Sequence, residues 1–236
     1  MEGKEYKKVN EAWIPSPWFN NASNDWRTVF KEAPQIIYKK NEMIYQQGEI
    51  NTYIYYVIEG RVRVSLLDDT GQEKSIIILN QGSIFGESCA IEQTPTEVTT
   101  TANTICNLAY IHRDQFLPVI LNSPLLCEKL IFNLTRKLSS LQHHIREITF
   151  MSAHERVIIY LYKLSVQYGK DTHEGRKISI SFTHQEMADL SGTSRVTVSN
   201  IMRVLTMSGI VQKINGYYYI RNTEEFTKWI PNGERR

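Results

Sequence analysis

The segment Thr183–Ser208 constrains the fold of this chain more than any other stretch, because its pattern predicts two short helices joined by a tight turn. Thr183 and Glu186 have the spacing of a capping box, so the first helix is expected to begin at Thr183. Gly192 supplies the tight bend that such a motif requires. Ser194 follows as the expected N-cap of the second helix. The sequence therefore predicts a helix-turn-helix.

The second helix of this motif separates into an apolar face and a polar face. Its inward residues, spaced at helical intervals, are Val198, Ile201, Met202 and Leu205. The outward face combines guanidinium, amide, hydroxyl and methyl groups, a mixture that suits base edges and phosphates in a major groove. The predicted DNA-binding residues are Thr183, Ser194, Arg195, Val196, Thr197, Ser199, Asn200 and Arg203. The alternative is an ordinary helical hairpin with a polar outer face.

Charge supports the first interpretation. Residues 150–236 hold twelve Lys and Arg against eight Asp and Glu, a balance of +4. Residues 1–149 hold fifteen against seventeen, a balance of −2. The positive part of the chain is thus the one with the helix-turn-helix, as phosphate binding requires.

The elements around the motif complete a winged helix over residues 150–236. Ser152 and Glu155 form another capping box and predict a helix that runs through Tyr168. A polar loop is expected next, then a short strand at 178–180. After the motif, Asn215-Gly216 between two apolar runs is a strong signal for a β-hairpin. A short last helix is expected around 224–229.

Residues 35–121 show short β-branched and aromatic runs separated by turn residues. The predicted strands are 36–38, 43–45, 53–58, 61–67, 75–79 and 104–111. Many short strands at near-regular spacing predict an antiparallel β-barrel or sandwich, small enough to fill with side chains or to hold one small ligand. Residues 1–34 precede it as an arm with a short helix. Its aromatic residues are expected to clamp onto the barrel, and they are Trp13, Trp18, Phe19, Trp26 and Phe30.

A long helix is predicted over residues 122–149, with Ser123 as N-cap and Pro124 at the first helical position. Its apolar residues recur at intervals of three and four: Cys127, Leu130, Leu134, Leu138, Leu141, Ile145 and Ile148. This heptad-like seam favours a two-stranded coiled coil, and the predicted dimerisation residues are Leu130, Leu134, Leu138, Leu141 and Ile145. The alternative is a monomer with an amphipathic helix. The predicted fold class is therefore α+β: an antiparallel β-barrel of jelly-roll type, a long dimerisation helix and a winged helix-turn-helix.

Composition argues against an enzyme. The three cysteines, Cys89, Cys106 and Cys127, lie far apart without a C-x-x-C pair, which excludes a local zinc cluster and favours free thiols. Only one of the six histidines, His112, belongs to the barrel, whereas a cupin-like metal enzyme, the rival class, would place several there. No resident cofactor or metal is predicted. Without a signal peptide or a long apolar run, we expect a cytoplasmic protein with no membrane partner.

In this order the motifs resemble the Crp/Fnr family of bacterial transcription regulators over about residues 35–222. The resemblance rests on Gly48-Glu49, on Glu59-Gly60, on the segment Asn80–Glu87, on the long helix and on Thr193–Ser199. It implies a homodimer that binds a palindromic operator in double-stranded DNA, with RNA polymerase as a further partner. It also implies a cyclic-nucleotide-binding-like barrel whose effector lies between the barrel and the long helix. The candidate effector-binding residues are Arg63, Gly86, Glu87, Ser88, Val98, Thr99, Arg136 and Lys137.

Departures from the family pattern concern the effector. Cyclic-nucleotide-binding members place Arg-Ser or Arg-Thr about ten residues after Gly-Glu, where this chain has Glu97-Val98. A carboxylate repels a cyclic phosphate, and valine offers no hydroxyl. A Thr-Ser pair of the long helix corresponds here to Leu141-Gln142. Cyclic AMP is therefore not the expected effector, although a cyclic-nucleotide-responsive regulator remains the alternative.

Redox cofactors fit no better, and a narrower resemblance points to a different effector. Residues 1–88 contain no cysteine, which excludes the N-terminal iron–sulfur cluster of oxygen-sensing members. A haem would need axial ligands, and His112 and Cys89 are the residues that could be proposed for that role.

The chain also resembles a narrower group, the regulators of reductive dehalogenation (halorespiration), which sense halogenated phenols. This resemblance rests on Ile14-Pro15 with Trp18-Phe19, on the lost phosphate arginine and on Val196–Ser199. We expect a small organic acid that binds as its anion, and a halogenated aromatic acid is the candidate that this resemblance implies.

The resemblance also bears on the operator. Members that recognise a T-G-A half-site carry a Glu, then two residues, then Ser-Arg, where this chain has Val196 and Ser199-Asn200. Valine can pack on a thymine methyl group, and asparagine can pair with adenine. The sequence therefore predicts an inverted repeat of A/T-rich half-sites of the T-T-A kind, about one helical turn apart.

Overall fold

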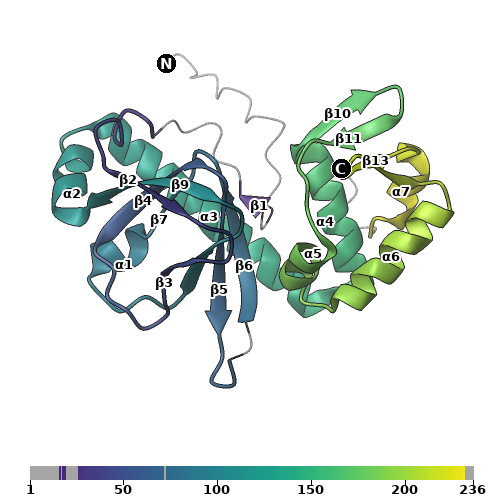
Figure 1. Ribbon diagram of the computed structural model, residues 1–236, viewed down its shortest axis with the longest axis horizontal. Helices are drawn as coiled ribbons and strands as arrows, with labels where there is room; N and C mark the ends of the chain where they lie inside the picture. The colour runs from purple at the N-terminus through teal and green to yellow at the C-terminus, as the bar shows by residue number, and fades with distance from the viewer. Residues whose placement is uncertain (1–15, 17, 20–25, 72, 232–236) are drawn as a thin grey trace, which may run out of the picture. The chain divides into compact units, whose positions relative to one another are not determined.

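The computed structural model describes residues 16, 18–19, 26–71 and 73–231. They divide into two compact units, one within Pro17–Arg146 and one within Glu147–Arg236. The fold is α+β: a sheet-rich N-terminal unit, a long helix and a C-terminal unit with a helix-turn-helix, as predicted (Figure 1). Trp13 and Ile14-Pro15 lie outside the described residues.

Two sheets build the N-terminal unit. The first has the strand order β1 (Trp18–Phe19), β6 (Glu73–Asn80), β5 (Arg61–Leu67), β8 (Thr99–Ala102) and β3 (Met43–Tyr45). The second has the order β2 (Gln35–Tyr38), β9 (Cys106–His112), β4 (Tyr53–Glu59) and β7 (Ile84–Phe85). All pairings are antiparallel except that of β1 with β6. The expected jelly roll thus forms as two separate sheets rather than one closed barrel.

The core of this unit has two layers, one on each side of the second sheet. Between the sheets lie Phe19, Tyr45, Tyr55, Val57, Val62, Val64, Ile77, Leu79, Phe85, Ala102, Cys106 and Leu108. The other face of the second sheet is covered by three helices and by the predicted aromatic clamp. The helices are α1 (Glu87–Glu92), α2 (Arg113–Leu121) and α3 (Pro124–Phe150). Trp26 and Phe30 are buried against Phe116 of α2, and Phe30 also stacks on Tyr56 of β4.

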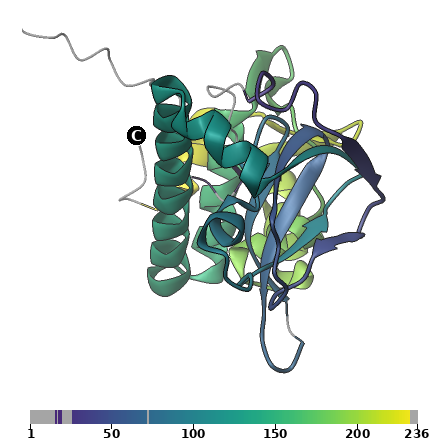
Figure 2. The same cartoon turned by 90° about the vertical axis from the view of Figure 1, so that its left-hand side faces the viewer.

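Helix α3 begins where the sequence predicts. The amide of Leu126 donates to Ser123 Oγ at 3.4 Å, which is the contact expected of an N-cap. Helices α2 and α3 meet at an angle of 114° (Figure 2). Within the described chain no single helix has the length and apolar character of a membrane span, although this bent pair passes that test when its two helices are taken together.

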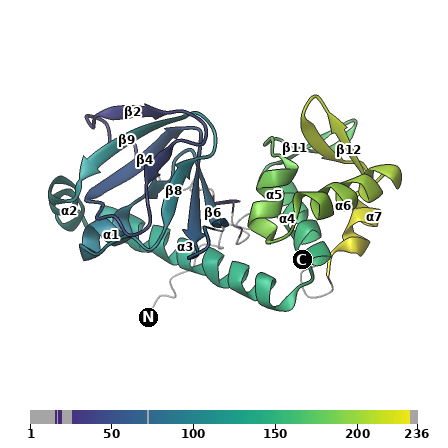
Figure 3. The same ribbon diagram turned by 60° about the horizontal axis from the view of Figure 1, so that its bottom comes forward.

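The C-terminal unit contains the predicted winged helix-turn-helix (Figure 3). Its helices are α4 (Ala153–Gln167), α5 (His184–Ser191), α6 (Arg195–Met207) and α7 (Thr223–Trp229). Its sheet has the order β10 (Gly169–Thr172), β11 (Gly175–Ile178), β13 (Tyr217–Ile220) and β12 (Val211–Ile214). Both capping boxes are formed, at Ser152 and at Thr183. Asn215 and Gly216 adopt φ values of 49° and 85°, as the predicted two-residue hairpin requires.

Several local predictions were wrong. The expected loop at 169–177 is the hairpin β10–β11, which pairs with β13 although its own sequence is polar. The strand expected at 178–180 extends no further than Ile178. Helix α2 was missed inside the segment assigned to strands, where Pro118 masks it. Strand β8 was missed because three of its four buried residues are threonines. Residues 27–32 of the arm form a series of turns, and most of the arm in which a short helix was expected lies outside the described residues.

Candidate DNA-binding helix and ligand cavity

The turn between α5 and α6 is fixed from both sides. Gly192 ends α5 with a left-handed φ of 61°, and the amide of Thr193 donates to Ala188 O at 3.1 Å. From α4, the Arg156 guanidinium donates to the carbonyl oxygens of Ser191 and Gly192 at 2.5 and 3.1 Å. The angle between the two helices is therefore supported by a residue that the sequence did not single out. An arginine four residues after a capping serine carries no signal of such a contact.

The predicted reading face of α6 is exposed. Ser194 caps the helix by accepting from the amide of Thr197 at 3.0 Å, and the two hydroxyl groups lie 2.9 Å apart. Arg195 is exposed, and Val196 is 68% exposed. On the opposite face Val198, Ile201, Met202 and Leu205 are buried, as expected. The helix therefore presents its polar face while its apolar face holds it to the unit.

Asn200 and Arg203 lie one turn apart on this exposed face. Arg203 Nη2 donates to Asn200 Oδ1 at 3.4 Å, so the two side chains contact each other in the free protein. Both residues are exposed. The contact orients the amide of Asn200 along the helix, and binding to a base would have to break or redirect it.

Ser199 belongs to a hydrogen-bonded chain that joins three elements. His184 Nδ1 lies 2.8 Å from Ser199 Oγ of α6, and His184 Nε2 lies 2.7 Å from Tyr218 Oη of β13. Burial lowers the pKa of His184, and the nearby charges of Lys213 and Arg195 lower it further. These hydrogen bonds connect α6 to the wing through His184. Ser199 is thus partly engaged, whereas the sequence placed it among groups that face DNA.

Two lysine side chains lie over aromatic rings of the wing hairpin β12–β13. The Lys213 ammonium lies 4.8 Å from the centre of the Tyr218 ring, and the Lys177 ammonium lies 4.1 Å from the centre of the Tyr217 ring. Such stacking holds a lysine in place without neutralising its charge. The C-terminal unit therefore presents positive charge on the wing as well as on α6.

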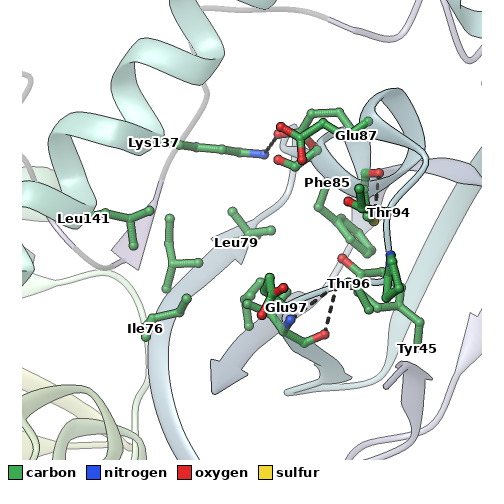
Figure 4. A pocket seen from close by; sticks show the side chains of 18 residues that line it. Tyr45, Ile76, Leu79, Phe85, Glu87, Thr94, Thr96, Glu97, Lys137 and Leu141 are labelled. Atoms are coloured by element: carbon green, nitrogen blue, oxygen red, sulfur yellow. Dashed lines mark hydrogen bonds and ion pairs between the residues drawn. The ribbon is translucent and has the colours of Figure 1, made fainter. Parts of the chain in front are cut away.

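The N-terminal unit contains a cavity of about 230 Å³ between the sheets and α3. Its walls are mostly apolar and aromatic, with Tyr45, Val64, Ile76, Ile77, Leu79, Phe85, Val98 and Leu141. Figure 4 shows Leu141 on one side and Tyr45 on the other. Burial raises the pKa of Tyr45 and of Tyr55 far above the ordinary range, so both phenols stay uncharged. The cavity can surround an apolar ring.

An ion pair spans one end of this cavity. Lys137 Nζ donates to Glu87 Oε1 at 2.5 Å and to Ile84 O at 2.8 Å. Figure 4 shows Lys137 reaching from α3 to Glu87. Gly86 before it has a φ of 84°, and a Cβ atom there would lie 2.6 Å from Tyr53 O, so only glycine fits. The Gly-Glu pair thus turns the chain and places a carboxylate, whose side chain is 3% exposed, in the cavity wall.

The candidate effector residues divide into two groups. The cavity is lined by Gly86, Glu87, Ser88, Val98 and Lys137. The other three do not line it. Arg63 pairs with Glu73 at 3.0 Å, Thr99 Oγ1 accepts from the amide of Gln47, and Arg136 lies one residue along α3 from the lining lysine.

The cavity also contains residues that the candidate set lacked. Glu97 and Leu141 line it, and with Val98 they are three of the four positions compared above as departures from the family pattern. Tyr45 and Phe85 line it as well, but aromatic residues in strands gave no means of telling a cavity wall from ordinary core.

The apolar residues of α3 lie on two faces. Cys127 and Leu130 pack into the core of the N-terminal unit, and Leu141 lines the cavity. On another face the large apolar side chains stay exposed within one chain: Ile131 at 64%, Leu134 at 38%, Leu138 at 57% and Ile145 at 58%. The apolar residues that the sequence presented as one seam therefore form two separate stripes, one buried in the N-terminal unit and one exposed.

A second ion pair is fully buried in the C-terminal unit. Lys163 of α4 contacts Glu147 in the last turns of α3, and the two side chains are 3% and 0% exposed. Tyr160 is buried beside them, and its pKa is raised by burial and by the charge of Glu147. Across the described residues, no group of three or more His, Cys, Asp or Glu side chains is placed to hold a metal ion.

A jelly roll with an internal cavity, a long helix and a winged helix-turn-helix together define a ligand-responsive regulator of transcription. Family comparisons agree with this class. The cyclic nucleotide-binding domain family matches residues 35–123, and the Crp-like helix-turn-helix domain family matches residues 155–229. The chain belongs to the Crp/Fnr family of transcription regulators.

Curated relatives support the same assignment, and solved structures show the same fold. The chain is 28% identical to the cyclic AMP receptor protein of Thermus thermophilus, over 78% of this chain and 82% of the relative. It is 29% identical to the cAMP-activated global transcriptional regulator CRP of Haemophilus influenzae, over 74% and 78%. Similar folds include a mutant of CooA from Carboxydothermus hydrogenoformans, with a TM-score of 0.75 and 23% identity over 86% of this chain and 89% of that one. CprK complexed with OCPA has a TM-score of 0.71 and 18% identity over 90% and 97%.

Proposed function

We propose that the chain is an effector-responsive, sequence-specific DNA-binding regulator that acts in the cytoplasm as a homodimer, and that it is not an enzyme. The observation that carries this proposal is the exposed face of α6. Arg195, Val196, Asn200 and Arg203 project from a helix that is capped, buried on its other side and tied to the wing. A helix held in this way can enter a major groove without losing order.

The proposed operator is an A/T-rich inverted repeat of the T-T-A kind. Val196 offers methyl groups to thymine, and Asn200 offers an amide to adenine. Arg195 donates to a guanine or a phosphate, and Arg203 to a phosphate. Because Arg203 contacts Asn200 in the free protein, the arginine must swing toward the backbone when the amide turns to a base.

The homodimer is proposed from the exposed stripe of α3. Ile131, Leu134, Leu138 and Ile145 follow the spacing of a coiled-coil seam, and a helix that left them in water would be unusual. A symmetric pair of winged helices would then meet two half-sites one helical turn apart. RNA polymerase is the further partner that we propose for such a dimer at a promoter.

The proposed effector is a small, weakly acidic aromatic molecule rather than cyclic AMP. The cavity of about 230 Å³ lies below the range of about 300–1,000 Å³ that is usual for ligand pockets, which favours a single ring. A carboxylate, Glu97, lines it near Val98, where a cyclic phosphate would need a cation. The motif resemblance to regulators of reductive dehalogenation supports a halogenated phenol, and the similar fold of CprK was solved with OCPA bound.

Cyclic-nucleotide response is the second candidate. It is favoured by the matched domain family and by relatives named for cyclic AMP. Glu97 and Leu141 in the cavity wall argue against it, because neither side chain can bind the phosphate or the base through a cationic or hydroxyl group.

Selection from a random duplex library tests the proposed function. Purified protein should enrich a T-T-A-type inverted repeat, and halogenated phenols should change its affinity more than cyclic AMP does. Asn200→Ala should cost about 1–3 kcal/mol at one base pair and relax specificity there. Arg203→Ala is the matched control, because it should weaken all sequences alike and reduce the salt slope by about one. Enrichment of a G·C pair at the Asn200 position, or no enrichment at all, would count against the proposal.

A further inference from the structure

The carboxylate of Glu87 is only half satisfied by the protein. Its Oε1 atom accepts from Lys137 at 2.5 Å, but its Oε2 atom is buried and has no hydrogen-bond partner among the described residues. The side chain is 3% exposed and forms part of the cavity wall. Buried acceptors almost always have a donor, so this oxygen indicates where a ligand or an ordered water donates a hydrogen bond.

Lys137 is poorly available to an anion. Two of its three N–H groups already donate within the protein, to Glu87 Oε1 and to Ile84 O, and its side chain is 15% exposed. The ammonium charge is therefore neutralised by the adjacent carboxylate. An anionic ligand at Lys137 would compete with Glu87 at close range in a poorly solvated place.

The other charged groups in the wall are also acidic. Glu92 and Glu97 line the cavity, so its charged side chains comprise three carboxylates and one ammonium. The remaining wall is apolar or polar without charge, with the neutral phenol of Tyr45 and the side chains of Ser88, Thr94 and Thr96, and it provides no compensating cation. The cavity thus suits an apolar body with a hydrogen-bond donor, and it disfavours a negative charge.

We propose that the cavity binds its ligand as an uncharged aromatic molecule whose O–H or N–H donates to Glu87 Oε2. A phenol is therefore bound in its neutral form, and phenolates, carboxylates and phosphate esters are rejected. This inference rests on the proposed function only for the statement that the cavity is the effector site. It reverses the expectation from sequence that the effector binds as its anion. The sequence shows Lys137 as a free cation, whereas the fold pairs it with Glu87.

The test is calorimetric titration of the full chain with three ring probes: phenol, pentafluorophenol and benzoate. Phenol should bind at least about tenfold more tightly than benzoate at neutral pH. Pentafluorophenol ionises near the acid end of the accessible pH range, so its affinity should fall as the pH rises through its own pKa. Phenol stays neutral over that range and reports any effect of pH on the protein itself.

Glu87→Gln gives a reciprocal prediction that misfolding cannot produce. Removing the charge should lower the affinity for phenol by about tenfold and raise the affinity for benzoate, because Lys137 is released to bind an anion. Glu59→Gln, at an exposed position that does not line the cavity, is the matched control and should change neither.

Three results would overturn the inference: tighter binding of benzoate than of phenol to the unmodified chain, pentafluorophenol affinity that rises with pH, or no binding of phenol at all. An unchanged phenol-to-benzoate ratio in Glu87→Gln would do the same. Failure of the proposed function is seen separately. If bound phenols left operator affinity unchanged, the cavity would not be the effector site, whereas the preference for neutral donors would stand.

Discussion

Replacing Lys163 by methionine should destabilise the C-terminal unit strongly. The substitution keeps the length of the side chain but leaves the Glu147 carboxylate without its cation. Glu147 is 0% exposed, so water cannot replace the lost charge. Breaking a buried ion pair from one side costs about 3–5 kcal/mol, and we expect a loss in that range.

Native-state hydrogen exchange of the α4 amides measures this effect without assuming that the two units unfold together. A loss of about 3 kcal/mol corresponds to exchange that is about a hundredfold faster. Lys170→Met is the matched control, because this lysine is exposed in the same unit and should change exchange little.

The double variant Lys163→Met with Glu147→Met separates the cost of an unpaired charge from the contribution of the pair. Without either charge, the unit should recover most of the lost stability, since apolar replacements of buried pairs are often neutral or stabilising. The reasoning is refuted if the single variant loses less than about 1 kcal/mol, or if the double variant is as unstable as the single one.

Three further predictions concern other parts of the chain. Leu138→Glu, on the exposed stripe of α3, should put like charges into the dimer seam. The variant should sediment as a monomer and bind its operator weakly. A dimer of unchanged stability would contradict the assignment of this stripe as the dimer interface. Because the pKa of His184 is lowered from 6.5 in the folded state, the unfolded chain takes up its proton first, and stability should fall as the pH drops through about 6.5 toward the lowered pKa. Melting temperatures at about pH 7.5 and about pH 5 should show this increment, and His184→Gln should lack it. Glu97→Arg with Val98→Ser should raise cyclic AMP affinity at least about tenfold in titration calorimetry, and no gain would mean that these positions do not exclude the nucleotide.

Local sequence determined the elements whose signals lie within a few residues of each other. The capping boxes at Ser152 and Thr183, the turn at Gly192 and the hairpin at Asn215-Gly216 all formed where predicted. Each depends on short-range hydrogen bonds or on a φ value that only certain residues adopt. The helix-turn-helix, and with it the family, could be predicted for that reason. The motif order along the chain added the jelly roll.

Strands whose sequences conflict with the usual patterns could be identified only from the tertiary structure. The threonines of β8 are buried by pairing with β5 and β3 rather than by their own character. The polar hairpin β10–β11 forms because β13 offers it a free edge. In both cases the neighbouring strand supplies the stabilisation, and a window of sequence does not contain it.

The division of α3 into two faces was also decided by the fold. Intervals of three and four residues predict a helix with an apolar side, but they do not say which side meets the protein's own core. Leu130 and Leu141 face the N-terminal unit, whereas Leu134 and Leu138 remain exposed. Only the placement of the sheets separates them.

The charges of the ligand cavity show most clearly where sequence reasoning ends. The sequence alone gave a glutamate at 87, a lysine at 137 and the loss of a phosphate-binding arginine at 97. The tertiary structure joined Glu87 to Lys137 across 50 residues, left one carboxylate oxygen without a donor, and gathered Glu97 into the same wall. How strongly a charged group attracts or repels a ligand depends on its burial and on its neighbours, which a sequence does not specify. The fold therefore decided that this cavity favours a donor over an anion.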